Sequence, residues 1–310
     1  MSPIHDIAFV RYTVIDLDRA QSFLTDFGLH TVARTSQALY SRAAGPVHHA
    51  HVAELGAENR PIGFGLLARN AESLGEVGRR VGRPVEANPE PGGGQRVRFT
   101  DPAGFLVDVI HGQGAHSPLP ARAAVLANTA AERRRRGRPV RMKPQASTVV
   151  RLGHVALLTG DFAKTYAFYR DLLGLLPSDT YWAGVEGHTV AAFMHCDLGP
   201  QWTDHHTLAV IAAPDGRSRF DHAAFEVIDL DDVVQGGEYL KSRGHTHSWG
   251  IGRHIQGSQI FDYWRDPFGN KLEHWTDGDL VNESTPVGTT PFTLDELKQW
   301  APPLTPDFLA

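Results

Sequence analysis

The stretch QIFDYWRDPFGNKLEHW, Gln259–Trp275, has the pattern of a β-hairpin, with two strand-forming runs around an Asp-Pro-Phe-Gly turn. Proline after aspartate suits the second position of a turn, and Gly269 supplies the permissive last position. The alternation of the second run places Glu273 on the face that a strand would bury. Because burying an unpaired charge costs several kcal/mol, this carboxylate needs partners from elsewhere in the chain.

The same hairpin pattern occurs once before and indicates an internal repeat. RFTDPAGFLVDVIHG, Arg98–Gly112, matches YWRDPFGNKLEHWTDG, Tyr263–Gly278, around the shared Asp-Pro-x-Gly turn. Val14–Leu29 and Leu158–Leu175 also match, and each is typical of a strand, a short loop and an amphipathic helix that ends at glycine. The chain therefore consists of two similar halves.

Each half also repeats internally. Strand, helix and hairpin patterns are expected around Ile7–Ser41, Gly63–Asp108, Leu152–Cys196 and Phe220–Trp275. We therefore expect an α+β fold of four βαβββ modules in two tandem domains, each an open mixed β-barrel with outer helices. Residues 1–115 are expected to form the first domain, 116–147 a linker, 148–285 the second domain and 286–310 a surface tail.

Composition narrows the class of protein. The 310 residues are 41% hydrophobic and 21% charged, which is typical of a globular protein. A formal net charge of −5 gives no general attraction to nucleic acid or to an anionic membrane, so neither partner is expected. We interpret the arginine run in Glu132–Lys143 as solvated linker. The single cysteine, Cys196, excludes an internal disulfide framework and, with no apolar leader, favours a cytoplasmic protein.

Three side chains predict a metal site. His154 lies in the first strand of the second half, His222 holds the matching place in the next module, and Glu273 lies on the last strand. A single buried histidine is more often a hydrogen-bonded core residue than a ligand. Together, at matched positions, two imidazoles and one carboxylate form the triad that leaves adjacent positions of an octahedral metal open.

The first half serves as an internal control. Phe9 stands where His154 stands, and Asp108 stands where Glu273 stands. The segment Arg60–Ala68, which matches the strand of the second histidine, contains no histidine. Since one carboxylate alone does not hold a divalent metal tightly, we expect the first domain to be free of metal.

Further polar side chains fall on strands near the proposed ligands. His205, His206 and His254 supply groups that titrate near neutrality, and the hydroxyl of Tyr263 can hydrogen-bond an ionised oxygen. The alternative interpretations are surface histidines and a core tyrosine.

These motifs resemble the type I extradiol ring-cleaving dioxygenases, the catechol 2,3-dioxygenase-like enzymes of the vicinal oxygen chelate superfamily. The resemblance spans both repeats and is most specific from Gly252 to Glu273, where His254, Tyr263, the Asp-Pro-x-Gly turn and the glutamate follow the family spacing. One position departs from the family, because Asp262 replaces an aliphatic residue or phenylalanine.

The resemblance implies a chemistry and a set of roles. His154, His222 and Glu273 resemble the ligands of Fe(II), with Mn(II) also acceptable. The substrates would be a catechol and O2, and the ring would open next to the diol to a semialdehyde or ketoacid, as in aromatic catabolism. A homo-oligomer is expected.

The resemblance also assigns the pocket. His205, with His206 as the alternative, resembles the acid/base histidine, while His254 and Tyr263 resemble the pair that hydrogen-bonds the substrate oxygens. Trp249 stands where some homoprotocatechuate-cleaving members place a carboxylate-binding arginine, which favours an apolar or larger aromatic substrate. We expect Trp249 and Trp202 to line the pocket.

Three other functions remain open from the sequence. A metal-dependent glyoxalase-like isomerase would need a fourth protein ligand, commonly a second carboxylate. A non-catalytic small-molecule-binding protein of the same superfamily would keep the barrel and lose the triad. Two histidines and one glutamate also suit a hydrolytic zinc site.

Overall fold

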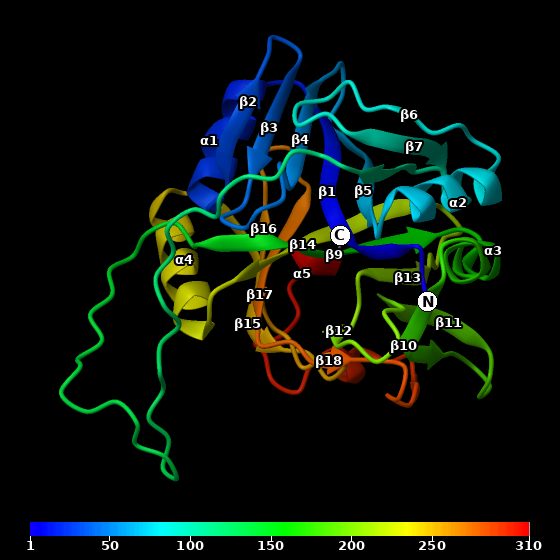
Figure 1. The fold of residues 1–310 in the computed structure, drawn as a ribbon. Helices are drawn as coiled ribbons and strands as arrows, with labels where there is room; N and C mark the ends of the chain where they lie inside the picture. Colours follow the sequence, from blue (N-terminus) through cyan, green and yellow to red (C-terminus); the bar gives the residue numbers. More distant parts are fainter. Residues whose placement is uncertain (310) are drawn as a thin grey trace.

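The computed structural model describes residues 1–309, so Ala310, the last residue of the expected tail, lies outside the described residues. The chain forms an eight-stranded sheet from its first half and a nine-stranded sheet from its second half. In Figure 1 the first half, in blue and cyan, lies above the second half. None of the helices described within residues 1–309 is both long and apolar enough to cross a membrane.

The first half consists of two βαβββ modules. Its strands are β1 (Ile4–Val14), β2 (His30–Arg34), β3 (Ala38–Arg42), β4 (His51–Leu55), β5 (Arg60–Ala68), β6 (Glu86–Ala87), β7 (Gln95–Thr100) and β8 (Leu106–His111). Its helices are α1 (Leu17–Phe27) and α2 (Ala71–Val81). The sheet order β2-β3-β4-β1-β5-β8-β7-β6 joins the two modules where β1 pairs with β5.

The second half repeats this plan with additions. Its strands are β9 (Val149–Thr159), β10 (Leu175–Trp182), β11 (Thr189–Cys196), β12 (Thr203–Asp204), β13 (Leu208–Ala212), β14 (Arg219–Val227), β15 (Thr246–Arg253), β16 (Ile260–Arg265), β17 (Lys271–Thr276), β18 (Leu280–Val281) and β19 (Gly288–Pro291). Its helical segments are α3 (Phe162–Ala167), a π-helical turn (Phe168–Leu172), α4 (Leu230–Ser242), a 3-10 turn (Leu294–Leu297) and α5 (Pro306–Leu309). The order β15-β16-β17-β14-β9-β13-β11-β10-β19 confirms the expected fold of four modules in two tandem domains.

The repeated hairpin turns are held by their aspartates. Asp266 Oδ1 accepts hydrogen bonds from the backbone N–H groups of Phe268 and Asn270, both at 2.8 Å, and Gly269 has a φ of 90°. In the first half, Asp101 Oδ1 accepts from the Phe105 N–H at 2.8 Å. The turn fixes the register of β16 on β17, in which Tyr263 pairs with Glu273.

One hydrophobic core joins the two halves. Phe27 at the end of α1 packs edge-on against Phe225 of β14, with ring centroids 5.6 Å apart. The Tyr169 hydroxyl of the second half donates a 2.6 Å hydrogen bond to Asp101 Oδ2 of the first.

The segment between β8 and β9 extends away from both sheets as a long loop (Figure 1). It is anchored where Arg122 pairs with Asp229 at 2.7 Å.

The first half neutralises its buried carboxylate with arginine. Asp108, 2% exposed on β8, accepts hydrogen bonds from Arg98 Nε at 2.6 Å and from Arg11 Nη2 at 3.3 Å. Arg11, also 2% exposed, reaches Glu90 Oε1 at 2.7 Å. A guanidinium group therefore occupies the position beside this carboxylate in the first domain.

We expect Arg11→Met to lower the free energy of unfolding by roughly 3–5 kcal/mol, because the change leaves buried carboxylates without their cation. Urea unfolding followed by tryptophan fluorescence measures the change. The control is Arg34→Met, because the ion pair of Arg34 with Asp18 is exposed to solvent and such pairs contribute about 1 kcal/mol or less. Equal effects of the two substitutions would contradict this role of Arg11.

Three buried histidines make stability depend on pH. Burial lowers the pKa of His49 and of His51 to about 3 and that of His195 to about 4. Each stays neutral when folded, whereas the unfolded chain takes up protons below the ordinary histidine pKa of about 6.5. Asp6 acts in the opposite direction, because burial raises the pKa of its carboxyl to about 7.

We expect the free energy of unfolding to fall as the pH is lowered from about 6 to about 4. Over this range the unfolded chain binds extra protons on several histidines, His274 included, and the proton that it lacks on Asp6 offsets only part of them. Urea titrations at several pH values, with a chelator present, measure it. A free energy that does not change over this range would contradict neutral, buried imidazoles.

Candidate active site

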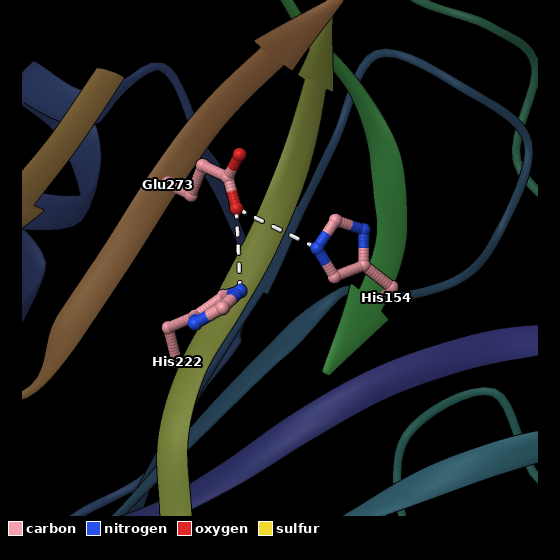
Figure 2. A group of neighbouring side chains, drawn as sticks. All are labelled: His154, His222 and Glu273. Carbon is pink, nitrogen blue, oxygen red and sulfur yellow. Dashed lines mark ion pairs between the residues drawn. The ribbon is translucent and has the colours of Figure 1, made fainter. Parts of the chain in front are cut away.

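Strand pairing brings the three proposed ligands together. Ala224 of β14 pairs with His154 of β9 on one side and with Glu273 of β17 on the other. His222 precedes Ala224 by two residues on the same strand, so its side chain points to the same face. Figure 2 shows the three side chains converging from β9, β14 and β17 on one point.

The triad is compact and buried. Glu273 Oε2 lies 3.5 Å from His154 Nε2 and 3.3 Å from His222 Nε2, and one donor atom from each residue lies within 4.8 Å of the others. Glu273 is 0% and His154 is 2% exposed. The burial of Glu273 would raise its pKa, but the adjacent imidazoles of His154 and His222 outweigh burial and lower it. The carboxylate therefore stays ionised.

The donor set fits a divalent cation. Within the described chain, neither carboxylate oxygen of Glu273 nor Nδ1 of His154 has a hydrogen-bond partner. A fully buried carboxylate with unused oxygens is expensive unless a cation neutralises it. Two imidazole nitrogens and one carboxylate oxygen suit Fe(II) or Mn(II) with further positions open.

A neighbouring carboxylate orients His222. Asp221 Oδ2 lies 2.6 Å from His222 Nδ1, and Asp221 Oδ1 accepts from Lys271 Nζ at 3.1 Å. With Nδ1–H directed to the carboxylate, Nε2 is free to face the other ligands. Burial lowers the pKa of His222, but Asp221 and Glu273 outweigh it and raise that pKa to about 9. A metal would displace this proton.

A cavity of about 290 Å³ opens beside the triad. Its lining includes both ligand histidines together with His206, His254 and Tyr263. Small and apolar side chains line much of the remainder, among them Ala156, Leu158, Ala191, Ala209, Ile211 and Phe193. The cavity therefore combines polar side chains with an apolar wall.

Of the two adjacent histidines, the structure brings His206 to the cavity. The His206 ring lies 4.0 Å from the His154 ring, whereas His205 is not among the cavity-lining residues. His205 Nε2 lies 2.6 Å from Asp179 Oδ2, and His205 Nδ1 lies 3.0 Å from His206 Nδ1. The structure therefore brings the alternative, His206, to the cavity, whereas the expected pocket histidine, His205, lies behind it and contacts Asp179.

His254 and Tyr263 form a hydrogen-bonded pair at the cavity. His254 Nδ1 lies 2.7 Å from the Leu297 carbonyl oxygen, which can only accept, so Nδ1 carries the proton. His254 Nε2 therefore accepts from the Tyr263 hydroxyl, 3.0 Å away. Burial raises the pKa of Tyr263 well above its ordinary value, so the phenol stays protonated.

Comparison with known proteins places the chain in a family. Residues 151–274 match the Glyoxalase/Bleomycin resistance protein/Dioxygenase superfamily. Over 305 residues the chain is 34% identical to Metapyrocatechase 2 from Cupriavidus necator, covering 96% of this chain and 89% of that protein. The chain belongs to the extradiol dioxygenases. It is also 33% identical over 135 residues to Biphenyl-2,3-diol 1,2-dioxygenase from Paraburkholderia xenovorans (strain LB400), or 43% of each chain.

Solved structures show the same fold. The Mn(II)-bound glyoxalase from Novosphingobium aromaticivorans superposes with a TM-score of 0.81 at 23% identity, covering 99% of this chain and 94% of that chain. The E323L mutant of Homoprotocatechuate 2,3-Dioxygenase from Brevibacterium fuscum superposes with a TM-score of 0.79 at 21% identity, covering 99% and 81%.

Both tryptophans expected in the pocket of this dioxygenase lie elsewhere. Trp249 is 1% exposed and packs on the ring of Phe261, with centroids 4.4 Å apart, and its Nε1 donates to the Pro302 carbonyl at 3.0 Å. Trp202 is 62% exposed. Neither lines the cavity, so that expectation is corrected: one side chain belongs to an aromatic cluster and the other faces solvent.

The departure from the family pattern at Asp262 does not affect the cavity. Asp262 is 1% exposed and accepts from His247 Nε2 at 2.7 Å and from Trp264 Nε1 at 2.8 Å. Alternation along β16 turns it to the opposite face from Tyr263.

Sequence reasoning missed two parts of the site. The first is the pair Asp221 and Lys271. The position of Asp221 directly before His222 could have indicated a carboxylate that orients a ligand, whereas no sequence pattern indicates the role of Lys271. The tail was expected to wrap the surface, yet three of its side chains line the cavity: Phe292, Leu297 and Phe308. No local pattern marks these three, because their contacts depend on how the tail returns to the sheet.

We expect Glu273→Gln to weaken Mn(II) binding by about 100-fold or more, because the amide removes the negative charge between the two imidazoles. Equilibrium titration with Mn(II), followed by electron paramagnetic resonance, measures the affinity. The matched control is Asp108→Asn, at the same place in the first half, which should leave the Mn(II) affinity unchanged. Wild-type affinity in Glu273→Gln would contradict the ligand assignment.

Proposed function

We propose that this dioxygenase opens the ring of a catechol next to its two hydroxyls, with a divalent metal held by His154, His222 and Glu273. The observation that carries the proposal is the buried, unpartnered carboxylate of Glu273 between two imidazoles at the cavity. When bound, the metal supplies adjacent open positions for the two catechol oxygens and for O2. We propose Fe(II) as this metal, with Mn(II) as the alternative that the same donors accept.

His254 and Tyr263 are proposed to orient the ring. The protonated Tyr263 hydroxyl can donate to an ionised catechol oxygen. The unprotonated Nε2 of His254 can then accept from the substrate instead of from the tyrosine. Two directed hydrogen bonds fix the ring plane relative to the triad, which is the geometric requirement for reaction between two bound substrates.

His206 is proposed to accept the proton of a catechol hydroxyl. Burial lowers its pKa well below the ordinary value, so the ring is neutral before substrate binds. It lines the cavity beside His154, within reach of a molecule bound at the triad. A positioned base of this kind contributes about 10²–10⁴-fold to rate.

The cavity walls favour a catechol with an apolar substituent. Small or apolar side chains continue from His154 along β9, namely Ala156 and Leu158, and Ala209 and Ile211 of the neighbouring β13 extend this wall. The two cationic side chains in the lining, Lys271 and Arg219, are each paired with a carboxylate of the chain. Phe292 and Phe308 of the tail add aromatic surface. We therefore propose alkyl- or aryl-substituted catechols as substrates in preference to carboxylated ones.

A glyoxalase-like isomerase is the alternative within the same fold. It would need a fourth protein ligand, and the metal-type cluster found among residues 1–309 contains three. The open positions favour ring cleavage.

Anaerobic reconstitution with Fe(II) or Mn(II), then addition of air and a catechol, tests the proposal. We expect oxygen uptake and a yellow ring-fission product, with alkyl- and aryl-catechols turned over faster than a carboxylated catechol. No turnover of any catechol by fully metal-loaded enzyme would contradict it.

His206→Asn and His205→Asn distinguish the two neighbouring histidines. We expect the first change to lower kcat by about 100-fold or more with metal content unchanged, because it removes the base at the cavity. His205→Asn should have a smaller effect, since its side chain lies outside the cavity. Steady-state kinetics with metal analysis measure both, and the reverse order would contradict the assignment of His206.

A further inference from the structure

Behind the cavity, Asp179, His205 and His206 form a chain of hydrogen bonds. Asp179 Oδ2 lies 2.6 Å from His205 Nε2, and His205 Nδ1 lies 3.0 Å from His206 Nδ1. His205 and His206 are 4% and 3% exposed. The chain runs from the partly exposed Asp179, with 21% of its side chain accessible, to the cavity wall.

The chemistry of these groups fixes the direction of each hydrogen bond. A carboxylate can only accept, so His205 Nε2 carries the proton that points at Asp179. When the His205 ring carries this one proton, its Nδ1 is the acceptor of the contact with His206. His206 Nδ1 must then donate, and Nε2 is the nitrogen of His206 left without a proton.

Packing holds the two rings in this arrangement. Phe193 contacts both, with ring centroids 5.7 Å from His205 and 4.7 Å from His206. A side chain at Gly257 would place its Cβ 2.9 Å from His205 Nδ1, so glycine is what allows the loop to cover that ring. The rings therefore have little freedom to exchange partners.

The tail covers the aspartate in a similar way. Gly288 of β19 pairs with Asp179 of β10, and a Cβ at Gly288 would lie 1.8 Å from Asp179 Oδ1. The tail strand can approach so closely only because it has no side chain at this position. This contact keeps the carboxylate directed toward His205.

The first half has the histidine pair without the aspartate. His48 Nδ1 lies 3.1 Å from His49 Nδ1, with rings 86° apart, against 88° for His205 and His206. Asp179 lies five residues after Gly174, the glycine that follows the second-half helix. The equivalent position in the first half, five residues after Gly28, is Ala33. The histidine contact therefore belongs to the repeated fold, whereas the carboxylate is particular to the half that carries the triad.

We propose that Asp179 and His205 are positioning residues that hold His206 in the Nδ1–H tautomer and so keep its Nε2 free to accept a proton in the cavity. The use of that nitrogen rests on the proposed function, whereas the tautomer itself does not. An imidazole in the opposite tautomer presents N–H to the substrate and cannot act as a base.

The kinetic test compares Asp179→Ala with wild type in the metal-loaded full-length chain. We expect kcat to fall by about tenfold or more, with KM and metal content within about twofold. Formate should restore part of kcat in Asp179→Ala, because it can supply the missing acceptor at this partly exposed position. The matched control is Asp26→Ala, which removes an Asp–His contact of 2.9 Å to His245 far from the cavity and should leave kcat unchanged. Unchanged kcat in Asp179→Ala, or a loss of metal in its place, would overturn the proposal.

A second measurement needs no turnover. Long-range ¹H–¹⁵N correlation spectra of the ¹⁵N-histidine-labelled full-length chain distinguish the two tautomers, and His206→Gln assigns the resonance. We expect the Nδ1–H tautomer at His206 in wild type and a mixture in Asp179→Ala. The Nε2–H tautomer in wild type would overturn the inference, even if catechol turnover were normal. Absence of turnover together with the Nδ1–H tautomer would instead contradict the proposed function alone.

Discussion

The structure of the second domain depends on a negative charge placed where water cannot reach it. Glu273 is fully buried on a central strand, and two imidazoles face it at 3.3 and 3.5 Å without forming good hydrogen bonds. Such a carboxylate is tolerated only with a compensating cation. Three neighbouring strands supply the ligands for one, and the cavity opens on the same face.

The two domains neutralise a buried carboxylate at the same position with different cations. At the position equivalent to Glu273, Asp108 is bound by the guanidinium groups of Arg98 and Arg11. Phe9 takes the place of His154. An arginine side chain neutralises the carboxylate but offers no coordination position to a substrate, whereas a metal ion keeps such positions open. The repeat therefore uses one scaffold for a structural ion pair and for a reaction centre.

Features tied to local pattern were predictable from the sequence. The Asp-Pro-x-Gly turn fixes the register of its hairpin, and with it the inward direction of Glu273 and Tyr263. Matching the modules was enough to select His154 and His222, because equivalent positions in a repeat face the same interior. The four-module fold followed from the same alignment.

Features that depend on tertiary contacts were not predictable. Of two consecutive histidines only His206 reaches the cavity, and the irregular segment before β13 has no periodicity from which to choose between His205 and His206. The family resemblance predicts Trp249 in the substrate pocket, but its side chain packs in an aromatic cluster under the tail. Asp179 meets His205 only because β10, the strand next to the edge strand β19, lies beside the His205 segment in the fold, and no spacing in the sequence encodes that contact.

Anomalous diffraction from crystals of the Mn(II)-loaded protein tests the central claim most directly. The account predicts one strong peak beside the cavity, about 2.0–2.3 Å from Nε2 of His154, Nε2 of His222 and a carboxylate oxygen of Glu273. It predicts no peak at Asp108, where arginine supplies the positive charge. A peak at the first-domain site, or an ordered structure in which Glu273 contacts no metal, would contradict it.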